Sequence, residues 1–122
     1  MYRIVFFKIP FMRGGYRVPA TPFGDKPIEH MGNYKVAEVV TDMAFSEQQR
    51  QIVLAHDTAV LVDNGAANFC YVAYTSTAAT GDYENDSRPA YYWVDDIEFL
   101  GVPPTENEPA AMVTISPDVW LT

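Results

Sequence analysis

The side chains best suited to chemistry in this chain are carboxylates, and they gather in its second half. Asp95, Asp96 and Glu98 lie close together, and Asp96 and Glu98 fall on one face of an extended segment, roughly 6–7 Å apart. Acid–base catalysis needs two carboxyl groups in different environments of a cleft, whereas this spacing is common on any exposed sheet face. We therefore expect no catalytic role for this group. For Asp95 we expect either a pairing with an arginine or a place at a subunit contact.

The segment 82–87 carries alternating oxygen ligands, as a calcium-binding loop does. Asp82, Glu84 and Asp86 supply these oxygens. A complete loop also needs glycine at its sixth position and a bidentate acid at its twelfth, where this chain has Ser87 and Trp93. The sequence therefore favours a solvated loop, with calcium binding as the lesser alternative.

The remaining reactive side chains form no recognisable set. His30 and His56 have no acid or cysteine at metal-ligand spacing. Cys70, the only cysteine, lies in an apolar stretch, so it can form no internal disulfide and is expected to be a buried, inert thiol. The chain has no Gly-x-Ser-x-Gly elbow and no phosphate-binding glycine loop. The sequence thus predicts neither an enzyme nor a cofactor or metal site.

The carboxylates and the other side chains named above must be held in place by strands. The segment Tyr91–Leu100 shows the clearest strand pattern in the sequence. Alternation places Tyr91, Trp93, Ile97 and Phe99 on one face, interrupted by Asp95. The following link contains Gly101 and three prolines, which ends the strand, and an extended pattern resumes over 112–116. A wide aromatic strand with a partner predicts a sheet that needs cover from a second layer.

The rest of the chain predicts further strands over 2–9, 34–40, 58–62 and 69–75, and polar or irregular links over 11–32 and 76–89. Ser46 and Gln49 match a capping box, which predicts a helix from Glu47 to His56 with the histidine at its C-terminus. At 122 residues the chain is long enough for one domain with a real core. The expected fold is mainly β, a β-sandwich or barrel-like domain of about six strands with one short α-helix, spanning 1–122.

Charge is unevenly distributed along the chain, whose formal net charge is −8. Residues 1–61 carry +1, whereas residues 62–122 hold Arg88 alone against ten acids. Binding to nucleic acid through phosphates needs basic clusters, so it is not expected. Ordinary solubility explains such acidity, and repulsion or mimicry of DNA, or a basic partner, are the functional alternatives. No apolar run has the length needed to span a bilayer.

Both ends of the chain resemble the first domain of the tail-knob, or distal tail tube, proteins of short-tailed, protein-primed Bacillus-type phages. The family has an aromatic strand whose order of residue types is matched from Tyr91 to Phe99, followed by an aliphatic strand closing on Asp-Val, matched by Asp118 and Val119. At the front, Arg3-Ile4 leading to Ile9-Pro10-Phe11 is similar to the family's first strand. Pro117 and the segment 76–89 depart from the pattern. The family proteins run on into further domains, so the resemblance implies a fragment or a stand-alone relative.

The resemblance implies a structural virion protein of the phage tail, made in the host cytoplasm. Such subunits form a ring that joins neighbouring tail proteins and lets DNA pass without specific binding. An acidic wall would repel phosphates. The candidate lumen or rim acids are then Asp82, Glu84, Asp86, Asp96, Glu98, Glu106 and Glu108, and the candidate subunit interface is Phe11, Tyr16, Phe23, Tyr91 and Trp93. The alternative is a small acidic binding protein that mimics DNA and inhibits a host or phage enzyme.

Overall fold

A computed structural model describes residues 1–9, 32–41, 45–46, 50–76, 83, 86–100 and 109–117 of the chain. The elements in chain order are β1 (Tyr2–Phe7), a 3-10 turn η1 (Gly32–Tyr34), β2 (Lys35–Thr41), β3 (Phe45–Ser46), β4 (Gln51–Ala55), α2 (His56–Asn64), β5 (Phe69–Tyr74), β6 (Ser87–Phe99) and β7 (Pro109–Pro117). Within this part of the chain, no helix is long and apolar enough to cross a membrane.

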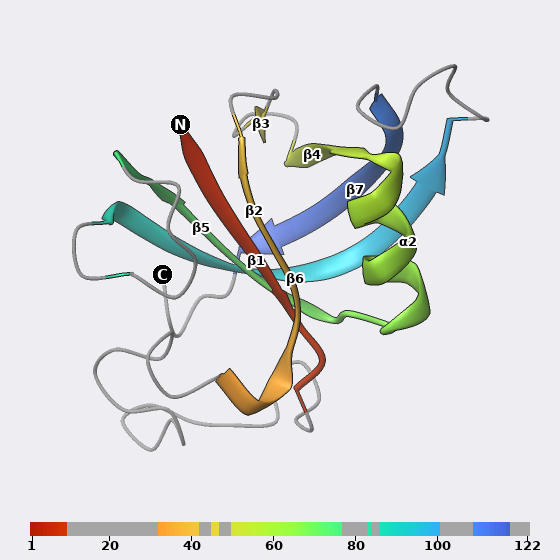
Figure 1. Ribbon diagram of the computed structural model, residues 1–122, viewed down its shortest axis with the longest axis horizontal. Coiled ribbons are helices and arrows are strands. Elements are labelled where there is room, and N and C mark those ends of the chain that lie inside the picture. Colours follow the sequence, from red (N-terminus) through yellow and green to blue (C-terminus); the bar gives the residue numbers. More distant parts are fainter. Residues whose placement is uncertain are drawn as a thin grey trace.

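The strands form one curled antiparallel sheet, a half-barrel, with the order β2-β1-β5-β6-β7-β4-β3 (Figure 1). β6 is the long central strand of the sheet and pairs with β5 over its first half and with β7 over its second. The mainly β prediction with one short helix is therefore confirmed. The prediction allowed either a β-sandwich or a barrel-like domain. The single continuous sheet corresponds to the barrel-like domain.

Buried side chains pack on both faces of the sheet. The inner face, defined as the one that carries α2, holds a cluster that includes Ile4, Phe6, Ile52, Val113 and, from the helix, Ala59 and Val62. The outer face holds a second cluster: Val5, Phe7, Ile9, Phe69, Tyr71, Ala73, Tyr91 and Trp93. Adjacent residues of β1 therefore alternate between two cores, as the period of an extended strand requires.

The predicted helix from Glu47 to His56 is wrong. Residues 51–55 form β4, where Ile52 and Leu54 are buried in alternation and pair with Val113 and Ala111 of β7. Ser46 lies in β3, so it is not a helix cap. Residues 47–49 lie outside the described residues. Pairing with a distant strand thus overrides the local capping signal.

The helix instead occupies His56–Asn64, where the sequence predicted a strand over 58–62. β-branched residues favoured the strand prediction, but the buried side chains Ala59 and Val62 are three residues apart, which is helical spacing. His56 is therefore the first residue of the helix rather than its last. Asp57 lies in the first turn, where a carboxylate suits the helix dipole.

Candidate functional site

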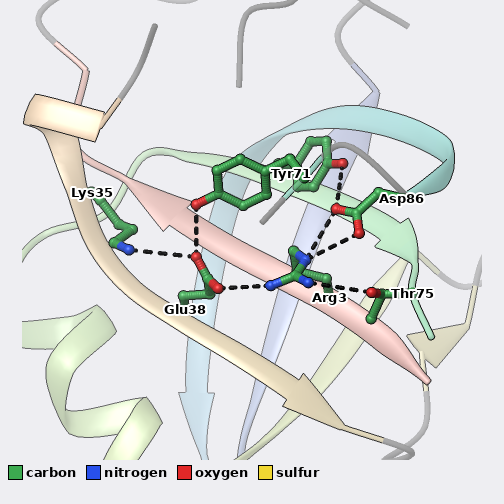
Figure 2. A network of polar contacts seen from close by, with 7 residues as sticks. Arg3, Lys35, Glu38, Tyr71, Thr75 and Asp86 are labelled. Atoms are coloured by element: carbon green, nitrogen blue, oxygen red, sulfur yellow. Dashed lines mark hydrogen bonds and ion pairs between the residues drawn. The ribbon is translucent and has the colours of Figure 1, made fainter. Parts of the chain in front are cut away.

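The most distinctive polar feature of the described residues is Arg3, the second residue of the otherwise apolar strand β1. Its side chain has no solvent exposure. Nε donates to both carboxylate oxygens of Asp86, at 3.0 and 3.2 Å, and Nη1 donates to Glu38 Oε2 at 2.8 Å. Nη2 donates to Thr75 Oγ1 at 3.2 Å. We call these four residues, together with Lys35, Tyr71 and Tyr83, the Arg3 network (Figure 2).

The sheet brings the members of the network together from distant parts of the sequence. Arg3 lies on β1 opposite Val40 of β2 on one side and Ala73 of β5 on the other. Glu38 comes from β2, and Asp86 immediately precedes β6. Because Arg3 shares the outer face of β1 with Val5 and Phe7, its guanidinium lies at the border of the outer cluster.

Two tyrosines complete the carboxylates' hydrogen bonds. Tyr71 Oη donates to Asp86 Oδ2 at 2.8 Å, and Tyr83 Oη donates to Glu38 Oε1 at 2.7 Å. Lys35 Nζ lies 3.4 Å from the same Glu38 oxygen, and the Arg3 guanidinium stands 5.4 Å from the centre of the Tyr83 ring. Each carboxylate therefore meets a cation and a phenol, which offsets the free energy lost on burying it.

The electrostatics of the network favour fixed protonation states. Burial alone would lower the pKa of Arg3, but the hydrogen bond and charge of Asp86, together with Glu38, raise it above its ordinary value. Burial and the hydrogen bond to Asp86 raise the pKa of Tyr71, and burial and Glu38 do the same for Tyr83. Among the described residues, no buried side-chain nitrogen or oxygen lacks a hydrogen-bond partner. The arrangement can lock three strands together, and it presents no poised acid, base or nucleophile.

Of the three candidate lumen acids among the described residues, Asp86 has its side chain inside the protein. Its side chain is fully buried against Arg3, so its prediction as a lumen or rim residue is wrong. Asp86 also cannot serve a cation site in the segment 82–87 while it binds Arg3 and Tyr71. The other acids of that segment, Asp82 and Glu84, lie outside the described residues, as do Glu106 and Glu108.

Asp96 and Glu98 are exposed on β6 and share one face, as their spacing predicted, but that face is the outer one rather than the face of Tyr92 and Val94. The predicted faces of the strand, however, hold only as far as Val94. The β6–β7 register shifts between Val94 and Asp96, so Asp95 is an extra residue in a bulge. The bulge puts Ile97 on the inner face with Tyr92 and Val94, instead of with Tyr91 and Trp93. Asp95 is exposed and accepts a hydrogen bond from Ser116 Oγ.

Two candidate interface residues are largely covered by the chain itself. Tyr91 is 5% exposed and Trp93 is 6% exposed, and both rings contact Phe69 in the outer cluster. They offer little area to a partner in this conformation. Phe11, Tyr16 and Phe23 lie outside the described residues, together with His30.

The remaining candidate groups show no assembled chemistry. Cys70 is fully buried, and burial raises the pKa of its thiol. Among the described residues, no three His, Cys, Asp or Glu side chains are close enough together to hold a metal ion.

Sequence reasoning missed the role of Arg3. One signal was available, because an arginine inside the otherwise apolar run Tyr2–Phe7 must find partners if the strand is buried on both faces. The identity of those partners was not readable, since Asp86 is 83 positions away.

Comparison of the chain with protein-family models, with curated proteins and with solved structures finds no significant match to any of them.

Proposed function

We propose that this protein is a structural component of a phage tail, a tail tube or tail-knob subunit that assembles head-to-tail into a ring through which DNA passes. The observation that carries the proposal is the division of its ionisable groups. The buried charged side chains of Arg3, Glu38 and Asp86 are tied together in the Arg3 network, which stiffens the sheet, while Asp96 and Glu98 stand exposed on its outer face. A stiff, acidic β-scaffold suits a wall along which DNA moves.

The physical role of such a wall is to keep DNA from adhering. Phosphates and carboxylates repel each other, and the repulsion is strongest within a narrow lumen where the intervening water layer is thin. The resemblance of the terminal strands to tail-knob proteins supports the same role, because β6 and β7, which carry most of it, pair as neighbours in the sheet.

The direct test is the mass of the native protein in solution. A ring-forming subunit should run as a multiple of 13.7 kDa in light scattering, either alone or with a tail partner. A chain that remains at 13.7 kDa at every concentration and with every tail protein offered would contradict the proposal.

The lumen charge can be tested separately. Asp96→Lys in the assembled protein should create DNA binding that the unaltered protein lacks, measured by a gel shift at low salt. The matched control is Asp57→Lys, an exposed acid on α2. Equal DNA binding by both variants would mean that Asp96 does not line the lumen.

A small acidic binding protein is the second candidate, and the charge asymmetry favours it. With ten acids against Arg88 in its second half, the chain could present carboxylates in place of DNA phosphates to a basic partner. In that case the protein stays monomeric and forms a salt-sensitive complex with a DNA-binding enzyme.

A further inference from the structure

The two ends of β6 differ in charge and in shape. At the start of the strand lies Arg88, the only Lys or Arg of residues 62–122, and it is exposed. At the end lie the exposed Glu98, Phe99 and Leu100, the last two being 44% and 51% exposed. Ten residues of extended chain separate Arg88 from Glu98, roughly 30 Å, and Figure 1 shows β6 crossing the whole molecule.

The backbone at the Arg88 end has an unusual conformation. The β5–β6 register shifts between Val72 and Tyr74, which pair with Ala90 and Ser87, so Arg88 and Pro89 oppose a single β5 residue. Arg88 itself has φ of 51°, a left-handed conformation that costs a non-glycine residue roughly 1 kcal/mol or more. This bulge turns the side chain onto the ring of Tyr74, with the guanidinium 5.8 Å from the ring centre.

Tyr74 lines two hollows. One of about 280 Å³ is lined by Met1, Tyr74, Thr75, Ser76 and Ser87. A narrower slot of about 20 Å³, on the inner face, is lined by Tyr2, Val72, Ala73, Tyr74, Arg88, Ala90 and Tyr92. Aromatic rings, hydroxyl groups and one arginine suit a partner that brings an apolar side chain next to a carboxylate.

We propose that the occupant is a second copy of this chain: the β6 end of one copy, with Glu98, Phe99 and Leu100, docks at the Arg88–Tyr74 end of the next. Glu98 pairs with Arg88, and the apolar side chains contact the Tyr74 hollow. Charge complementarity carries this choice, since the end rich in exposed acids meets the single exposed cation of the same half of the chain. The contact is head-to-tail, as the ring of the proposed function requires, and the inference rests on that function.

Charge reversal tests the contact. Arg88→Glu and Glu98→Arg should each weaken self-association at least tenfold, measured by light scattering over a concentration series. An equimolar mixture of the two variants should associate again, because each reversed end then meets a reversed partner and each native end meets a native one. The double variant in one chain should also associate.

The chain provides a close control for Arg88. Arg50 is also an exposed arginine with positive φ, at 56°, so Arg50→Glu makes the same charge change on the same kind of backbone. It should leave association unchanged, as should Asp63→Arg on α2. Circular dichroism of every variant establishes that the sheet is folded, and the mixture reports on the contact because recovery requires two folded variants.

The outcomes separate this contact from the proposed function. Association that survives Arg88→Glu, or that the mixture does not restore, overturns the contact and leaves the ring proposal standing. A protein that never associates, alone or with tail partners, overturns both.

Discussion

At the scale of single residues, Arg3 shows why a charge can lie inside this protein. A guanidinium without solvent needs hydrogen bonds and a compensating charge, and two carboxylates and a threonine hydroxyl accept from each of its three nitrogens. Replacing the whole group by apolar residues leaves stability similar in other proteins, but removing Arg3 alone leaves two buried carboxylates without it. The network is therefore most sensitive to loss of its central cation.

This sensitivity gives a stability prediction. Arg3→Met should lower the free energy of unfolding by about 3–5 kcal/mol in urea titrations, because Asp86 and Glu38 remain buried without Arg3. Lys35→Met is the control, since it removes the other cation of Glu38 at a side chain that is 35% exposed, and it should cost less than about 1 kcal/mol. Similar losses in the two variants would show that the network is not held by Arg3.

At the scale of elements, the C-terminus of α2 shows how packing sets a residue's identity. Ala67 N donates to Val62 O and Ala66 N donates to Asp63 O, the pattern of a Schellman motif. The left-handed position of this motif, usually glycine, is Ala66, with φ of 50°. The glycine stands one residue earlier, at Gly65, because a Cβ there would lie 2.4 Å from Val36 Cγ1 of β2.

The close approach of α2 to β2 predicts a clear difference between two glycines. Gly65→Ala should destabilise the protein by about 1–3 kcal/mol, since the methyl group overlaps a stiff β-branched side chain and lies 3.1 Å from Leu61 O. Gly32→Ala adds a methyl group with nothing within 4 Å and should change stability by less than about 1 kcal/mol. Thermal unfolding followed by circular dichroism compares them, and equal shifts would contradict the tight packing of the helix end.

At the scale of the whole molecule, the buried Cys70 and Tyr71 and the partly buried Tyr83 couple folding to alkaline pH. The pKa values of Cys70, Tyr71 and Tyr83 are all raised by burial, from ordinary values of 9.0, 10.0 and 10.0, and those of the tyrosines also by their carboxylate partners. The folded chain keeps these protons where the unfolded chain releases them. The stabilisation is complete below about pH 9 and is lost as the pH rises above these ordinary values.

We therefore expect the protein to unfold in alkali, with a limiting slope of about 4 kcal/mol per pH unit when all three protons are released only on unfolding. Phenolate absorbance and circular dichroism, followed together between pH 8 and 12, should show Tyr71 and Tyr83 ionising with the loss of structure. Tyr83→Phe should reduce the slope by about a third. Ionisation of both tyrosines while the sheet stays folded would count against the burial of the network.

The sequence by itself determined the class of fold, because the alternation of apolar and polar residues is local and survives in any sheet. It located most of β1, β2, β5, β6 and β7, although β6 begins at Ser87, inside the predicted loop, and it indicated a buried Cys70. Only the tertiary structure decided where the helix lies, where the Asp95 bulge reverses the faces of β6, and which carboxylates surround Arg3. Each of these depends on a partner far along the chain, such as Asp86 for Arg3, so no local pattern could contain it.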